Sequence, residues 1–188
     1  MTYYAFIKNN KIDGCGQCKI LNTDIQNIEI SQEVFDNIEK YIWDGENIIP
    51  DPEYDNKQLT KAKEIKYQEA NLKANEFLQL GEALYEFEPN KHIEATDGNI
   101  AKMTAYALAY VTGQLQPTDT VVWNTKEDET VELNQAQIVS ILNGLGNVQA
   151  AVWSVQYPVY VNEIETATTV EEVEAIIINY TTPNESED

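Results

Sequence analysis

The chain has 188 residues, a length that suits one domain or two small ones, and its 43% hydrophobic content is ordinary for a globular protein. Its charge is unusual, because 12 basic residues, all lysines, face 32 acidic ones and give a formal net charge of −20 at pH 7. Binding to duplex nucleic acid or to an anionic membrane relies on Lys and Arg, so the charge argues against both partners.

The compartment is predicted from patterns at the start and along the chain. The first residues have no basic start followed by a long apolar run, as a signal peptide would, and no apolar run approaches the length of a membrane span. We therefore expect a protein that stays in the cytoplasm where it is made.

Residues 1–55 predict a small N-terminal α/β unit. Residues 3–8 have strand composition, and Asn9-Asn10 suits a two-residue hairpin turn because Asn tolerates positive φ. A return strand should follow from Lys11 toward Leu21.

The second part of this unit predicts a helix and another short β element. After a strand at 28–30, Ser31 is a good N-cap for a helix that we expect to run to about Tyr41. Residues 43–49 then predict a strand with an Asp-Gly turn.

Residues 56–80 predict one long connector helix, because they contain no Pro or Gly and are rich in Lys, Ala, Glu, Gln and Leu. The connector has five Lys and three acidic residues, whereas residues 1–55 have four and 11 and residues 81–188 have three and 18. A long helix with a thin apolar stripe typically connects domains or packs against a partner helix. The stripe consists of Leu59, Ala62, Ile65, Leu72 and Phe77.

Residues 81–182 predict a C-terminal helical domain with a β-hairpin, which makes the chain α+β. A short strand at 84–87 precedes a helix from Thr96 to Thr112, with Gly113 as its C-terminal stop. The buried face of this helix is expected to hold Met103, Ala107, Tyr110 and Val111.

The hairpin is predicted by strand patterns at 120–124 and 130–133 around an acidic turn. Asn134 with Gln137 resembles a capping box and should open a helix that runs to about Tyr157, where Pro158 should kink or end it.

The last helix is predicted over 170–180, because Thr169 with Glu172 forms a capping-box pattern. Residues 183–188 form a frayed acidic tail in this prediction.

The Cys15 and Cys18 pair is the sharpest local motif. A redox pair belongs at a helix N-terminus, whereas these cysteines lie in a predicted hairpin arm. A zinc site would have only His92 and a carboxylate to complete four ligands. Small residues in a glycine-loosened strand are the simpler interpretation, and we expect no metal or other cofactor.

An enzyme is not the expected class. His92 is the only histidine, and no nucleophile elbow accompanies it, so a surface or capping position is favoured over a catalytic one. A small hydrolase or metal-dependent enzyme remains as a third alternative. The rings of Trp43 and Trp123 suit a protein contact, although core packing explains most such rings.

Two motifs in the C-terminal half resemble a known family. Residues 123–134, WNTKEDETVELN, are similar to its pattern of Trp, an acidic turn and Val-x-Leu-Thr/Asn, and residues 164–173, IETATTVEEV, are similar to its ending. The family is the phage and prophage domain of unknown function 4376, found in tail-region genes, and the resemblance covers about residues 84–178. Where the family often has a His or a charged residue in its long helix, this chain has Trp153 and then Pro158.

The N-terminal half resembles the front of tail-fibre and tail-fibre assembly proteins. The similar segments are residues 12–14, residues 41–49, and Pro50 followed by a Lys-rich helix.

The resemblance implies a non-enzymatic tail-fibre assembly factor, a chaperone-like binder of fibre protein in the host bacterial cytoplasm. The alternative is a virion component of the tail, baseplate or fibre adaptor, in which the connector is an oligomer or docking seam. The residues expected to contact the partner are Leu59, Ala62, Ile65, Leu72, Phe77, Trp43 and Trp123.

Overall fold

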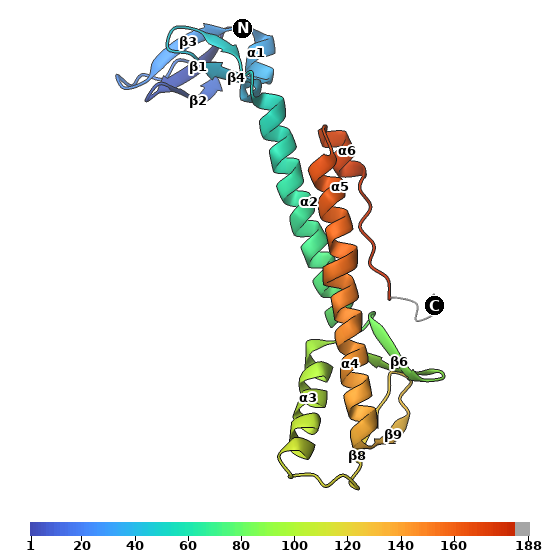
Figure 1. Ribbon diagram of the computed structural model, residues 1–188. Coiled ribbons are helices and arrows are strands. Elements are labelled where there is room, and N and C mark those ends of the chain that lie inside the picture. The colour runs from blue at the N-terminus through green and yellow to red at the C-terminus, as the bar shows by residue number, and fades with distance from the viewer. Residues whose placement is uncertain (183–188) are drawn as a thin grey trace. The chain divides into compact units, whose positions relative to one another are not determined.

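A computed structural model describes residues 1–182, and the chain divides into two compact units, residues 1–61 and residues 62–188. The chain is α+β, with small antiparallel sheets beside the helices (Figure 1). The boundary falls inside the long helix α2 (Tyr54–Gln79), which therefore contributes residues to both units. The predicted acidic tail lies outside the described residues.

Unit 1, residues 1–61, is built on a three-stranded antiparallel sheet of order β2-β1-β3. Asn9 and Asn10 both have left-handed φ values, 52° and 61°, which confirms the predicted two-residue hairpin turn. Ala5 and Ile7 are buried on the central strand. The strands are β1 (Tyr3–Lys8), β2 (Lys11–Gly16) and β3 (Gln26–Ile30).

The return strand is shorter than predicted, since β2 ends at Gly16 and does not reach Leu21. The chain instead forms a loop that a side chain of β3 holds. The Asn27 amide accepts from the backbone N–H of Ile20 at 2.8 Å and donates to its carbonyl at 3.0 Å. Side-chain bonds of this kind compete with the pairing of a strand.

The predicted helix from Ser31 to Tyr41 is wrong in length. Ser31 caps it as expected, but helix α1 (Gln32–Asp36) stops where the Asn37 amide donates to the Glu33 carbonyl at 3.0 Å. Aromatic and β-branched residues then favour a strand over a helix. The elements that follow are η1 (Ile38–Lys40, a 3₁₀ turn), β4 (Tyr41–Trp43) and β5 (Ile48–Pro50).

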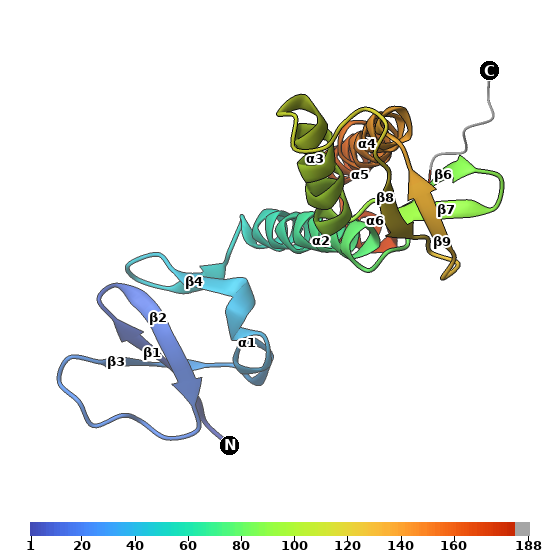
Figure 2. The same cartoon turned by 90° about the horizontal axis from the view of Figure 1, so that it is seen from below.

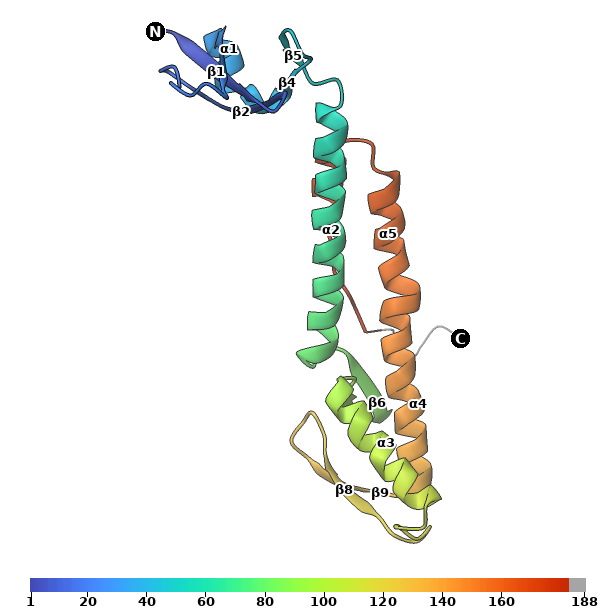
Figure 3. The same cartoon turned by 90° about the vertical axis from the view of Figure 1, so that its left-hand side faces the viewer.

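In unit 2, residues 62–188, the C-terminal part of α2 lies beside a long helical rod that runs in the opposite direction (Figures 1 and 3). The predicted capping box is present at the start of this rod, because the Asn134 and Gln137 side chains each bond the other's backbone N–H. The rod consists of α4 (Gln135–Ala151), the π-helical segment η2 (Val152–Gln156) and α5 (Tyr157–Thr166).

Pro158 was predicted to kink or end the helix near Tyr157, and an end there is wrong, because the rod continues through a π-helical segment to Thr166. Pro158 lacks an N–H and its ring crowds the preceding turn. The wider π turn lies directly before the proline, and Pro158 itself occupies the first turn of α5, where a missing N–H is tolerated.

Helix α3 (Asp97–Val111) confirms its predicted limits, with Thr96 as N-cap and Gly113 at φ +74° just past its end. Met103 and Tyr110 are buried as expected. Val111 is 80% exposed, so its predicted burial is wrong.

Two hairpins complete this end of unit 2 and lie next to each other (Figure 2). The backbone N–H of Lys126 in one donates to the carbonyl of His92 in the other at 2.9 Å. The first is β6 (Leu84–Glu88) with β7 (Lys91–Glu94), and the second is β8 (Val121–Asn124) with β9 (Thr130–Leu133). Strand β7 was not predicted, and the others were.

The C-terminal strap, residues 176–182, replaces the second half of the predicted last helix. The Thr169–Glu172 capping box is present, but α6 (Val170–Ala175) ends before the run of isoleucines. Ile178 and Tyr180 are buried, and the hydroxyl of Tyr180 donates to the carbonyl of Ala70 in α2 at 3.0 Å. The β-branched and aromatic residues of this segment favour an extended backbone, and burial against α2 holds the segment in place.

The core of unit 2 joins α2, both hairpins, α3, the rod and the strap. Its largest fully enclosed side chains are contributed by strands and helices alike. They include Ile93, Met103, Leu133, Ile138, Ile141, Leu145 and Val152.

Candidate functional site

Helix α2 has two different faces, and the predicted apolar stripe is divided between them. Ala70, Ala74 and Phe77 face the core of unit 2, where Phe77 is 9% exposed and its ring lies 6.3 Å from that of Tyr180. Ile65 and Leu72 are 56% and 57% exposed. At 100° per residue these two point away from the alanine face.

The remaining predicted contact residues are less accessible than expected. Leu59 and Ala62 are half-buried. Trp123 is 8% exposed, because alternation along β8 turns it into the core, where it packs edge-on against Tyr106. A surface position for Phe77 and Trp123 is therefore wrong. Trp43 is half-buried, and its Nε1 donates to the Asn10 side chain at 3.1 Å.

The outer strip of α2, defined as Ile65, Gln68, Leu72, Asn75 and Gln79, is exposed along its whole length. These residues recur every three or four positions, the spacing of the seam in a coiled coil. All five are uncharged in a unit with six Lys and 21 acidic residues. A shallow hollow of about 350 Å³ lies beside Leu72. The apolar pattern of the sequence predicts only Ile65 and Leu72 of this strip, because its other three members are amides.

Two of the five lysines of α2 hold the C-terminal strap of unit 2. Lys66 and Lys73 donate to the carbonyls of Ile176 and Ile178 in the strap, at 3.3 and 3.2 Å. The same two ammonium groups flank Glu69 at 2.8 and 3.1 Å and lower the pKa of its carboxyl. The Lys-rich face therefore binds the chain's own C-terminal segment.

The cysteines lie at the end of β2 and in the loop after it. Cys15 is half-buried, and burial, with a smaller effect of Glu39, raises the pKa of its thiol. A raised pKa disfavours the thiolate that redox chemistry and metal binding require. Cys18 is exposed.

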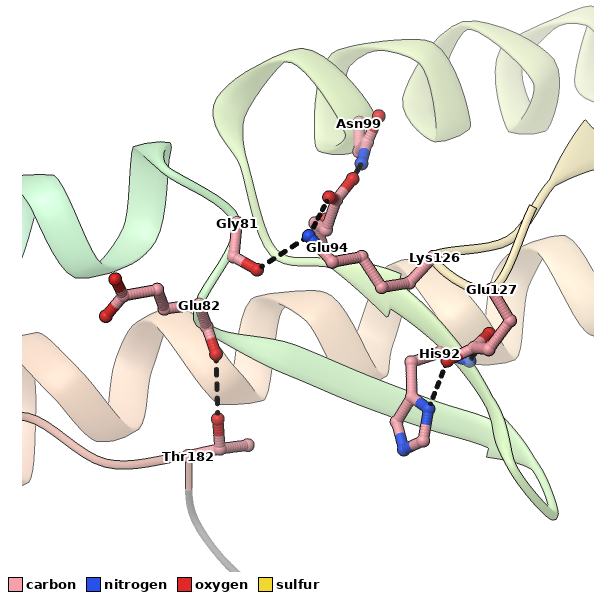
Figure 4. Close-up of polar contacts among 8 residues, drawn as sticks. All are labelled: Gly81, Glu82, His92, Glu94, Asn99, Lys126, Glu127 and Thr182. Atoms are coloured by element: carbon pink, nitrogen blue, oxygen red, sulfur yellow. Dashed lines mark hydrogen bonds and ion pairs between the residues drawn. The ribbon is translucent and has the colours of Figure 1, made fainter.

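Several polar contacts join the two hairpins of unit 2 and the loop before β6 (Figure 4). Glu127 accepts from the backbone N–H of His92 at 3.0 Å, and its other oxygen lies 2.7 Å from Nδ1 of the same residue. These bonds lower the pKa of Glu127 to about 2. Lys126 pairs with Glu94 at 2.7 Å and donates to the Gly81 carbonyl at 3.4 Å.

His92 thus has a carboxylate partner that sequence analysis did not anticipate, since Glu127 lies 35 positions away. Within residues 1–182, no three His, Cys, Asp or Glu side chains gather as a metal site would require.

The rod α4–α5, residues 135–166, is long and apolar enough to cross a membrane by length and composition alone. In this structure Ile138, Ile141 and Leu145 lie in the core of unit 2, whereas Val139, Val155 and Val159 are exposed.

Comparison with known proteins found no matching family model, no matching curated protein and no matching solved structure.

Proposed function

We propose that this chain is a bacteriophage tail-associated protein, a non-enzymatic assembly factor that binds tail-fibre protein through the outer strip of α2. It acts in the host bacterial cytoplasm while fibres assemble. The resemblance of residues 123–134 and 164–173 to the phage tail-region family supports the setting. Those segments form the β8–β9 hairpin with the capped start of α4, and the capped helix α6.

The observation that carries the proposal is the exposure of Ile65 and Leu72, two large apolar residues one heptad apart on a face that contributes nothing to the core. A helix with that spacing presents a narrow apolar strip against which an amphipathic partner helix can pack. The amides of Gln68 and Asn75 between them bond polar groups of the partner without adding charge.

The charge of unit 2 suits a protein that keeps a partner in solution. It has 15 more acidic than basic residues in its sequence, so a bound fibre segment acquires a strongly anionic neighbour. Repulsion between such complexes opposes the edge-to-edge association of unassembled fibre chains.

The test is co-expression with the tail-fibre protein encoded by the same phage or prophage. We expect soluble, co-purifying fibre protein with the natural chain and its loss with an Ile65→Asp/Leu72→Asp variant. The matched control is Leu108→Asp/Val111→Asp, which places the same charges on exposed apolar residues of α3. Equal fibre yield with both variants, or with no factor present, would contradict the proposal.

The alternative, a virion component, is favoured by one feature of the strip. Gln68, Asn75 and Gln79 are amides at seam positions, and an amide can pair with the same residue of a second copy. Mass spectrometry of purified particles and of the infected-cell lysate separates the two functions. Stoichiometric presence in particles supports the virion component, whereas abundance in the lysate alone supports the assembly factor.

A further inference from the structure

A pocket of about 660 Å³ lies between the β6–β7 hairpin and α4, and it shares no lining residue with the outer strip. Its volume falls within the range of small-molecule sites, about 300–1,000 Å³. Tyr85, Glu86 and His92 line it from the hairpin, and Ser140, Asn143 and Asn147 line it from α4.

The wall of this pocket depends on a close approach of a ring to a helix. A Cβ at Gly144 would lie 2.5 Å from Cε1 of Tyr85 and closer still to Cζ and Cε2 of the same ring. Only glycine lets the ring rest against the backbone of α4 at this point. Gly144 therefore sets the position of Tyr85 in the wall.

The α4 side of the pocket is a row of neutral hydrogen-bonding groups. Ser140, Asn143 and Asn147 are three or four residues apart and so share one helical face. Within residues 1–182, neither these side chains nor the Tyr85 hydroxyl bonds another side chain or backbone group. Together they offer both donors and acceptors to a ligand.

His92 adds a ring nitrogen of defined direction. Glu127 is ionised at neutral pH, because its pKa is about 2, and an ionised carboxylate only accepts hydrogen bonds. Nδ1 of His92 must therefore carry the hydrogen that joins them, so Nε2 is the ring nitrogen left to bond a ligand. Glu86 provides an acceptor, although one of its oxygens already accepts from the Asn90 N–H at 2.6 Å.

The charges exclude anionic ligands. Glu86 lines the pocket, Glu127 lies behind His92, and the nearby Lys91 is paired with Glu88 at 3.0 Å. A phosphate or carboxylate would meet net negative charge in this part of the unit.

We propose that this pocket binds a neutral carbohydrate of one or two sugar units. Sugar hydroxyls both donate and accept, so they can bond Nε2 of His92, donate to Glu86 and accept from the amides of Asn143 and Asn147. The C–H face of a sugar ring matches the apolar part of the wall, formed by Leu84, Tyr85 and Val148. The inference rests on this lining and is independent of the phage assignment.

The experiment is saturation-transfer NMR on the full chain with glucose, galactose, mannose, N-acetylglucosamine, lactose, maltose, cellobiose and N,N′-diacetylchitobiose, and with spermidine as a cationic probe. We expect transfer to at least one sugar. Asn143→Ala/Asn147→Ala should weaken that binding about tenfold or more, since two hydrogen bonds of ordinary strength are removed.

The matched control is Asn56→Ala/Asn162→Ala, which removes two exposed amides from α2 and α5, away from the pocket, and should leave sugar binding unchanged. Gly144→Ala should weaken binding by displacing Tyr85, and Gly146→Ala should not. No transfer to any sugar, transfer insensitive to Asn143→Ala/Asn147→Ala, or transfer to spermidine alone would overturn the proposal.

Discussion

Two glycines of α4 make a sharp prediction, because the same substitution should have opposite effects at positions two residues apart. A Cβ at Gly144 would overlap the ring of Tyr85, whereas a Cβ at Gly146 would meet no atom within 4 Å. We therefore expect Gly144→Ala to destabilise the protein and Gly146→Ala to stabilise it.

The magnitudes follow from two terms. Ala is favoured over Gly inside a helix by about 0.5–1 kcal/mol, and Gly146→Ala gains this amount in full. Gly144→Ala gains it too, but forcing a group into filled space costs about 1–3 kcal/mol or more. The free energies of unfolding of the two variants should differ by about 1–3 kcal/mol.

The assay is urea unfolding followed by circular dichroism, with thermal melting as a second measurement. For a chain of this size each kcal/mol shifts Tm by roughly 2–4 °C, so the variants should melt several degrees apart with the natural protein between them. Equal stabilisation by both substitutions would refute the packing of Tyr85 on Gly144, and with it the wall of the pocket.

Three further predictions concern the strap, the hairpin junction and the cysteines. Tyr180→Phe should lower the free energy of unfolding by about 1 kcal/mol and speed hydrogen exchange in residues 176–182, because it removes the bond to Ala70; unchanged exchange would contradict the strap's attachment. The pKa of Glu127 is depressed from 4.5 to about 2 on folding, so its stabilising effect is present above pH 4.5 and is lost as the pH falls toward 2. Glu127→Gln should make the free energy of unfolding depend less on pH between 4.5 and about 2. An unchanged pH dependence in this range would refute the bonding of Glu127 to His92. Iodoacetamide at pH 7.5 should modify exposed Cys18 faster than Cys15, whose thiol pKa is raised, and peptide mapping that finds Cys15 modified first would contradict the placement.

Local signals predicted much of the fold. The turn at Asn9-Asn10 and the caps at Ser31, Asn134 and Thr169 are set by residues near one another in the sequence, and all are present. Such interactions involve a few adjacent residues, so their patterns are visible without knowledge of the rest of the chain.

The failures occur where distant contacts decide the conformation. The strap is extended because Ile178 and Tyr180 find a buried place beside α2, about 105 positions earlier in the chain. The pairing of His92 with Glu127 likewise depends on two hairpins meeting. No pattern within either segment shows which distant residues it contacts.

The candidate site was predicted in part. Ile65 and Leu72 are exposed on one face of α2, as a partner-binding stripe requires. Phe77 lies on the opposite face, together with the small residues Ala70 and Ala74 that mark the core side of the helix. A stripe predicted without Ala70 and Ala74 does not distinguish the two faces.

The most direct test of the central proposal is site-specific photo-crosslinking inside cells that are producing phage. A photoreactive phenylalanine analogue is placed at Gln68, in the middle of the outer strip, and at Gln114, an exposed position after α3, as the control. We expect an adduct with tail-fibre protein from Gln68 and none from Gln114. A Gln68 adduct only with a second copy of this chain, or fibre adducts of equal yield from both positions, would contradict it.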